Sequence, residues 1–238
     1  MSKRYVAKTD VGRQRNHNED SVLATEIQDG AVLLAVADGM GGHAAGDVAS
    51  ELALETFEDN IAEVSANTVT DWEDHLHTAI TTANEAILEE QDEHSDMGTT
   101  LVAAVIEDER AIVANVGDSR AYGLTQADIE QISVDQSLVQ QLIKEGHIDE
   151  KEAEDHPQRN VISQALGRDE TIDADFYQVS DVDTVLLCSD GLCEEVDDST
   201  IHKRTVAAST YEEAAVALIS TANDNGGSDN VSVVIGDV

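Results

Sequence analysis

The chain has 238 residues, and 13 lysines and arginines stand against 50 aspartates and glutamates, so its formal net charge is −37 at pH 7. A charge of this sign repels nucleic acids and anionic membrane surfaces, which argues against both as partners. The two cysteines are too few for a disulfide scaffold, and no apolar run approaches the roughly 20 residues of a membrane span.

The first half of the chain predicts strands followed by two amphipathic helices. Apolar runs predict strands at Tyr5–Lys8, Ser21–Glu26 and Ala31–Ala37. Apolar residues spaced close to 3.6 positions apart predict helices from about Ala45 to Val64 and from about Asp71 to Glu90.

The second half returns to strands and contains a polar insert. The remaining predicted elements are strands at Thr99–Ile106, Ala111–Val116 and Arg120–Leu124, a short helix at Ser137–Gly146, a polar stretch at His147–Asn160, strands near Asp173–Val179 and Thr184–Cys188, a helix around Ala214–Ala222 and a last strand at Val231–Ile235. A tight turn at Gly117-Asp118-Ser119 precedes the third of these strands. The order lacks strict strand–helix alternation, so it favours antiparallel sheets covered by helices over a doubly wound parallel sheet.

The charge of −37 admits two interpretations. High net charge with low hydrophobicity prevents collapse and gives disorder. Against this, 41% of the residues are hydrophobic and regularly patterned, and the acids are spread along the whole chain. We therefore favour a folded domain with an acidic surface, as expected in the high-salt cytoplasm of a halophilic organism. No signal-peptide pattern opens the chain, so we expect a cytoplasmic monomer that folds as one domain over residues 1–238.

Two apolar runs end abruptly in Asp-Gly. They are Leu33–Gly39 and Val185–Gly191. Continuous apolar runs of this length predict strands that are buried on both faces. A carboxylate at the tip of such a strand, here Asp38 and Asp190, is held at the rim of a core, where an unpaired charge is costly.

Further acidic residues lie in turn-like contexts at Glu19-Asp20, Asp118 and Asp229. Taken alone, each is best interpreted as a solvated turn residue, because the chain has 50 acids. Together with the two strand-end aspartates they indicate one metal site assembled from both halves of the chain. Ligands that are oxygens only suit Mg²⁺ or Mn²⁺, and no His or Cys spacing typical of zinc is present.

Such a site favours chemistry at phosphorus. Two carboxylate-bridged cations about 3.5–4 Å apart lower the pKa of a shared water and make hydroxide available as a nucleophile. Arg15 lies five residues before Asp20, and a guanidinium can bind two phosphate oxygens at once. The simpler interpretation of Arg15 is an ion pair on an acidic surface.

Seven short motifs follow one another along the chain. They are Gly12–Ser21, Val36–His43, Met97–Thr100, Asn115–Tyr122, His156–Gly167, Ser189–Leu192 and Ser228–Ser232. In this order they resemble the metal-dependent serine/threonine protein phosphatases, called the PPM or type 2C family, in their short bacterial form. The resemblance implies an α+β fold, a four-layer α-β-β-α sandwich of two antiparallel sheets flanked by helices. It also implies a flap insert at about 136–160, where the polar stretch lies.

The resemblance implies two core ions, Mn²⁺ or Mg²⁺, and a third, weaker one. Asp38 would bridge the core ions, and Gly39 would bind through its carbonyl oxygen. Asp190 and Asp229 would complete the shell of one ion.

The same resemblance gives roles to residues around the core ions. Glu19 and Asp20 would contact or orient the metal-bound waters. Asp118 matches the position that contributes to the third ion in bacterial members, and Arg15 would bind the substrate phosphate.

A histidine is the candidate general acid, because its pKa suits proton donation near pH 7. In eukaryotic members a histidine directly follows the Asp-Gly pair. Here Met40-Gly41-Gly42 intervenes before His43, as in bacterial members. Two roles therefore stay open for His43, proton donation to the leaving oxygen and positioning of a water. Asp38, Arg15 and His43 are the candidate catalytic residues.

The predicted function is hydrolysis of phosphoserine and phosphothreonine by a dimetal-activated water, without a phosphoenzyme. The resemblance implies phosphorylated proteins as substrates, a signalling role and a serine/threonine kinase as the opposing enzyme. The alternative is an inactive family member that serves as a phosphoprotein-binding module. Such proteins usually lose metal carboxylates, whereas Asp38, Asp190 and Asp229 all remain.

Overall fold

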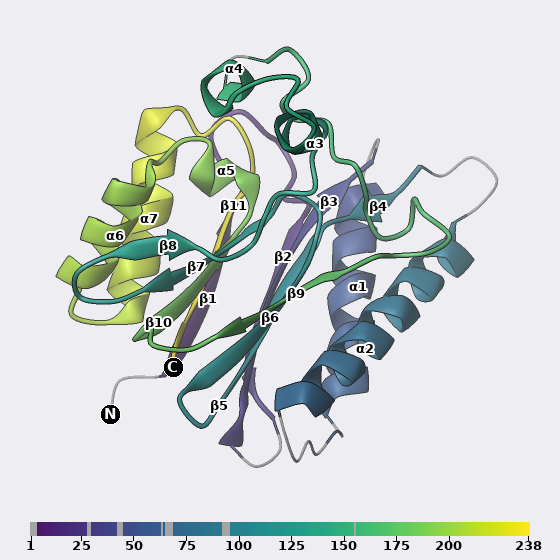
Figure 1. Cartoon of the computed structure of the whole chain (residues 1–238), viewed down its shortest axis with the longest axis horizontal. Helices are drawn as coiled ribbons and strands as arrows, with labels where there is room; N and C mark the ends of the chain where they lie inside the picture. The colour runs from purple at the N-terminus through teal and green to yellow at the C-terminus, as the bar shows by residue number, and fades with distance from the viewer. Residues whose placement is uncertain are drawn as a thin grey trace.

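Two antiparallel β-sheets lie face to face, and helices cover both outer faces (Figure 1). The computed structural model describes residues 4–27, 30–41, 45–62, 64, 69–91, 96–154 and 156–238. The layers run helix, sheet, sheet, helix, which confirms the α+β sandwich expected from the sequence.

The first sheet has five strands in the order β1-β11-β10-β7-β8. Their bounds are β1 Tyr5–Asp10, β11 Val231–Asp237, β10 Thr184–Cys188, β7 Arg120–Leu124 and β8 Ile129–Gln131. Each pair of neighbours is antiparallel, so the first and last long strands of the chain lie side by side.

The second sheet has the order β2-β3-β5-β6-β9, with the short strand β4 paired to β3. Its strands are β2 Asp20–Glu26, β3 Val32–Met40, β4 Gly98–Thr99, β5 Leu101–Glu107, β6 Arg110–Val116 and β9 Asp175–Val179. All of its pairings are antiparallel as well.

The helices fall into three groups in Figure 1. Helices α1 (Ala45–Ala62) and α2 (Val69–Glu90) cover the second sheet. Helices α5 (Asp190–Cys193), α6 (Asp198–Ala207) and α7 (Tyr211–Asn225) lie against the first sheet. The short helices α3 (Leu138–Lys144) and α4 (Glu150–Glu154) lie at one end of the sandwich, the end where α5 is found. No helix in the described part of the chain is long and apolar enough to cross a bilayer.

Strand β3 shows how the core is divided. Its side chains alternate, so that Leu33, Ala35 and Ala37 join the core beneath α1 and α2, whereas Val32, Leu34 and Val36 join the core between the two sheets. Every one of these six residues is buried, which confirms the prediction of a strand buried on both faces.

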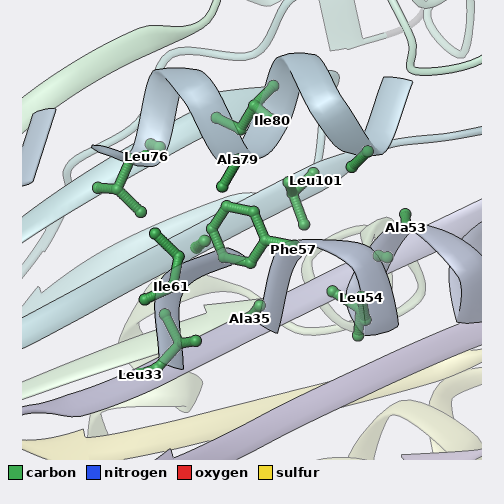
Figure 2. Close-up of a cluster of buried hydrophobic side chains, with 14 of the residues drawn as sticks. Leu33, Ala35, Ala53, Leu54, Phe57, Ile61, Leu76, Ala79, Ile80 and Leu101 are labelled. Carbon is green, nitrogen blue, oxygen red and sulfur yellow. The ribbon is translucent and has the colours of Figure 1, made fainter. Parts of the chain in front are cut away.

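The outer core between the second sheet and its helices centres on Phe57 (Figure 2). Figure 2 shows its ring between α1 and α2, with Leu76 and Ile80 on one side and Leu33 on the other. Phe57 has no exposed surface, and burying a side chain of this size contributes about 1.5–3 kcal/mol. This packing fixes α1 against β3, the strand that carries Asp38.

Several predictions about elements need correction. The sequence patterns did not predict β8, α4, α5 or α6. Helix α4 is a five-residue polar segment without an apolar stripe, and α6 buries only Ile201 and Thr205, so periodicity gives no signal for either. The predicted strand Thr99–Ile106 is divided at Thr100, which separates β4 from β5.

The position of Asp38 also differs from the prediction. It does not end its strand, because β3 continues to Met40 and pairs there with β4. Asp190 does follow an apolar strand closely, but it opens α5 rather than a turn.

Candidate active site

Asp20 and Asp38 lie directly opposite each other on β2 and β3. By the alternation of β3, the side chain of Asp38 points to the same face as Leu34 and Val36, into the layer between the sheets. Burial raises the pKa of Asp20 to about 6. Burial, followed by the charge of Asp20, raises the pKa of Asp38 well above its usual range. Two neighbouring carboxylates thus share the end of the inter-sheet core.

Three more carboxylates lie close enough for their charges to act on Asp38. Asp118 lies in the β6–β7 turn, Asp190 opens α5, and Asp229 comes two residues before β11. After burial and Asp20, the charges of these three residues are what raise the pKa of Asp38. Burial raises the pKa of Asp118 to about 6, with Asp135 as the next cause. The structure therefore gathers five acidic side chains that are far apart in the sequence.

Two oxygens in this cluster fit a bound cation. Ser189 Oγ and Ser232 Oγ both donate to Asp20 Oδ2, at 2.8 and 2.6 Å, while Asp20 Oδ1 is buried without a hydrogen-bond partner. Asp190 Oδ1 is buried and unpartnered as well. Buried carboxylate oxygens without a donor are unfavourable, and a divalent cation offsets that cost. The donor set fits Mg²⁺ or Mn²⁺.

The described acidic side chains do not form a closed metal shell by themselves. Among the residues that the structure describes, no group of three or more His, Cys, Asp or Glu side chains is arranged to hold a metal ion by itself. A closed shell of that kind is typical of structural zinc, whereas Mg²⁺ keeps several of its waters. Water and backbone oxygens would therefore supply much of the coordination here.

Both Asp-Gly glycines serve close backbone packing. A side chain at Gly39 would collide with the carbonyl oxygens of Gly46 and Glu19, and one at Gly191 would collide with the carbonyl oxygen of Asn230. The Gly39 N–H also donates to Glu19 O at 3.1 Å. These two glycines thus let α1 and the β11 loop approach the acidic cluster closely.

Glu19 is anchored through its backbone. Its carbonyl oxygen accepts from Ser50 Oγ at 2.6 Å, and its N–H donates to Asn230 Oδ1 at 2.8 Å. Its partly buried carboxylate lies next to Gly46 at the start of α1, and burial raises its pKa. The anchoring fixes where Glu19 enters the site.

Arg15 lies on an exposed loop that is tied to the β11 loop. The N–H groups of Arg13 and Gln14 both donate to Gly227 O, at 2.8 and 3.1 Å. Arg15 Nη2 lies 2.5 Å from Asp229 Oδ2, and half of the Arg15 side chain is exposed. The guanidinium is therefore next to the acidic cluster and open to solvent.

Asn230 holds this arrangement together, and the sequence analysis gave it no role. Its Oδ1 accepts from Glu19, and its Nδ2 donates to Val11 O and His17 O at 3.0 and 2.9 Å. One carboxamide thus fixes both ends of the Arg15 loop. The sequence feature that could have indicated this role is an Asn directly after Asp229 in a glycine-rich loop.

Thr100 is a second residue without a predicted role. Its Oγ1 accepts from the Asp38 N–H at 3.0 Å and lies 2.8 Å from Ser119 Oγ. Its own N–H donates to Asp38 O at 2.9 Å. Thr100 therefore links the backbone of Asp38 to the turn that carries Asp118. His43, the candidate general acid, lies outside the described residues.

Residues 11–223 match the family described as Protein phosphatase 2C. The chain belongs to the protein phosphatase 2C family. It is 39% identical over 234 residues to serine/threonine phosphatase stp of Listeria monocytogenes serotype 4b (strain F2365), covering 96% of this chain and 93% of the relative. It is 41% identical over 242 residues to serine/threonine protein phosphatase PstP of Mycobacterium tuberculosis, covering 99% of this chain and 45% of PstP.

Solved structures agree with this protein phosphatase 2C assignment. The S. agalactiae serine/threonine phosphatase has a TM-score of 0.92 at 33% identity, with 98% of each chain covered. The catalytic domain of PstP in complex with two manganese ions has a TM-score of 0.84 at 36% identity, covering 98% of this chain and 97% of that one. The resemblance seen in the sequence motifs is confirmed.

The raised pKa values predict an unusual pH dependence for this phosphatase when it is free of metal. The pKa of Asp20 is about 6 in the folded state and about 3.9 in the unfolded chain, so the folded state binds more protons between these values. The free energy of unfolding should therefore fall by about 2 kcal/mol as pH rises from about 4 to about 6. The raised pKa of Asp118 lowers the free energy of unfolding over the same pH range.

Urea unfolding of the EDTA-treated protein at pH 4 and pH 6 measures this slope. The Asp20→Asn variant cannot titrate there, and its shallower slope separates the Asp20 contribution from that of the acidic surface. Mn²⁺ should remove much of the slope, because a cation favours the ionised carboxylates. An identical slope in Asp20→Asn would contradict the prediction.

Proposed function

We propose that this site hydrolyses phosphoserine and phosphothreonine in proteins, using two divalent cations held by the acidic cluster, with Mn²⁺ or Mg²⁺ as the ions. Members of the protein phosphatase 2C family are enzymes, and this chain is a metal-dependent serine/threonine protein phosphatase. The observation that carries the proposal is the pair of buried, unpartnered oxygens of Asp20 and Asp190 beside Asp38.

The proposed metal ligands are those that the family resemblance implies, and the gathering of the acidic residues supports them. Asp38 would bridge the core ions, with Gly39 contributing its carbonyl oxygen. Asp190 and Asp229 would complete one shell. Bound cations of this kind supply a water of lowered pKa as the nucleophile and neutralise charge on the phosphate.

The remaining residues orient water and substrate. Glu19 and Asp20 would contact or orient the metal-bound waters, and Asp118 would contribute to a third, weaker ion. Arg15 would hold two phosphate oxygens, since its guanidinium is exposed beside Asp229. His43 would donate the proton to the leaving oxygen or position a water.

The hydrogen bonds of the site explain how these groups stay in place. The two serine hydroxyls hold Asp20 by its Oδ2 and leave Oδ1 without a donor. Thr100 holds Asp38 by its backbone, which leaves the Asp38 carboxylate free to bind. The chain itself thus pre-organises the carboxylates, and little ordering remains for the moment of binding.

The proposal also covers the domain bounds, location and partners of the enzyme. We propose one phosphatase domain over residues 1–238, with a flap at about 136–160, acting as a cytoplasmic monomer on phosphoproteins and opposed in signalling by a serine/threonine kinase. The inactive-module alternative has no support, because the relatives are named as phosphatases and the acidic residues are present.

The direct test is turnover of p-nitrophenyl phosphate and of a phosphothreonine peptide, with Mn²⁺ at molar KCl. We expect hydrolysis of both that EDTA abolishes and added Mn²⁺ restores. Folded protein that binds the peptide without turnover would favour the binding module instead.

Arg15→Ala should raise the KM for the phosphopeptide about 10- to 100-fold, because a charge-assisted hydrogen-bond pair contributes roughly 1.5–3 kcal/mol. The matched control is Arg13→Ala, an exposed arginine on the same loop. Initial rates over a range of peptide concentrations measure both variants. Equal KM values for the two variants would remove Arg15 from the phosphate site.

A further inference from the structure

The flap, residues 136–160 with α3 and α4, is closed at its base by a short ladder. The Leu138 N–H donates to Val161 O at 2.8 Å, and the Ser163 N–H donates to Gln136 O at 2.8 Å. Ser137 and Ile162 form an antiparallel bridge between these two bonds. The two ends of the flap are therefore joined into one unit.

Gln136 joins this base to the turn that carries Asp118. Its N–H donates to Gly117 O at 2.9 Å, and its Oε1 accepts from the Gly117 N–H at 3.0 Å. Gly117 has a φ of 102°, and a side chain there would collide with Thr100, so this turn has little freedom. The reciprocal pair fixes the residue directly before Asp118.

The same carboxamide reaches two further segments. Its Oε1 also accepts from Gln164 Nε2 at 3.1 Å, and its Nε2 donates to Asp175 Oδ2 on β9 at 2.8 Å. The amide accepts from Gly117 and donates to a carboxylate at the same time, whereas an ionised carboxylate can only accept. A glutamate at this position would face Asp175 with like charge.

Asp135, the residue before Gln136, also connects the flap base to the Asp118 turn. Asp135 accepts from Arg120 Nε at 2.9 Å and from Arg120 Nη2 at 2.7 Å, and neither side chain is fully exposed. Arg120 is two residues after Asp118. The flap base is thus bonded to both sides of Asp118, through Gly117 before it and Arg120 after it.

We propose that Gln136 is a positioning residue that couples the flap base to the Asp118 turn, so that flap placement sets the affinity of the cation bound at Asp118. The inference rests on the proposed function only where it takes Asp118 as a ligand of the third ion. Among the described residues, Gln136 forms no hydrogen bond to a proposed core-ion ligand, and it acts through Gly117.

The test compares Gln136→Leu, which loses all side-chain bonds, with Gln136→Glu, which keeps the acceptor and loses the donor. The control is Gln141→Leu, because Gln141 is exposed on α3 and, among the described residues, its side chain bonds only to Glu145 one turn away. Amide hydrogen exchange of Leu138 and Ser163 is measured on the metal-free proteins. Their acceptors, Val161 O and Gln136 O, are unchanged in every variant.

In Gln136→Leu we expect both amides to exchange about 3- to 30-fold faster, and the weakest Mn²⁺ site, titrated by calorimetry, to lose affinity by a similar factor. Gln136→Glu should also exchange faster than the native protein, because it loses the bond to Asp175 and faces that carboxylate with like charge, and Gln141→Leu should match the native protein. If Gln136→Leu fails to fold, Gln136→Glu carries the comparison, because it keeps the bond to Gly117.

Native exchange rates in both Gln136 variants would overturn the proposal, and so would faster exchange with unchanged Mn²⁺ affinity. Neither readout requires turnover. A native protein without Mn²⁺-dependent hydrolysis would therefore refute the proposed function while the exchange and binding comparison still decides the role of Gln136.

Discussion

Asp38→Asn should lower turnover by at least about 10³-fold, because it removes the charge proposed to bridge the two core ions and brings an NH₂ group into a carboxylate cluster. Asp118→Asn should lower turnover only in part and weaken the dependence on metal concentration. Steady-state rates with p-nitrophenyl phosphate over a range of Mn²⁺ concentrations separate the two variants. Asp74→Asn, an exposed aspartate on α2, is the matched control.

In the metal-free protein, Asp38→Asn should increase stability, although it lowers turnover in the metal-bound enzyme. The pKa of Asp38 is raised by burial and by the neighbouring carboxylates, so its ionised form is unfavourable near pH 7 without a cation. Asp38→Asn should therefore increase the free energy of unfolding in EDTA and abolish the stabilisation by Mn²⁺. A fully active Asp38→Asn enzyme would refute the bridging role, whereas a less stable metal-free variant would contradict the electrostatic argument.

The fold was predictable where strands are long and buried. The apolar runs of β3 and β10 were recognisable because both faces of each strand pack against a core, with Leu186 on one side of its sheet and Val185 and Leu187 on the other. The helix α6 was missed, although Asp197 caps it by accepting from the Thr200 N–H at 3.0 Å. That cap was visible in the sequence as Asp-Asp-Ser-Thr, but it is a weak signal in a chain with 50 acids.

The site was predictable only in its charged members. A carboxylate after an apolar run carries a physical cost, and this cost makes Asp38 and Asp190 stand out in the sequence. Asn230, Thr100 and Gln136 carry no such signal. Asn230 meets Glu19 across 211 positions, and no local pattern records a contact between residues so far apart. Residues that position others are found only when the chain is folded.

The acidic surface leads to the second large prediction, which concerns salt. Within the described residues, four ion pairs join a lysine or arginine to a carboxylate, far fewer than the 50 acids. Helix α2 has no basic residue in its last turn and ends in Glu89-Glu90, at the negative end of the helix dipole. The unpaired surface acids repel one another mostly through solvent, so mobile ions screen this repulsion.

We expect the Tm to rise by about 10 °C or more between 0.1 M and 2 M KCl, which corresponds to roughly 3–4 kcal/mol for a chain of this size. The Debye length falls from about 10 Å at 0.1 M to about 3 Å at 1 M, so repulsion between neighbouring surface acids is largely removed. Calorimetric scans in EDTA, with KCl and NaCl at equal ionic strength, measure the effect without a contribution from Mn²⁺.

A variant makes this test specific to surface charge. Glu89→Gln with Glu90→Gln removes two charges without touching the core, and it should raise the Tm at 0.1 M KCl while leaving the Tm at 2 M nearly unchanged. Thr81→Val, an exposed change on the same helix with no charge, is the control. An equal Tm at low and molar salt would show that the native contacts of the sandwich already outweigh a net charge of −37, and would remove the reason to infer adaptation to high salt.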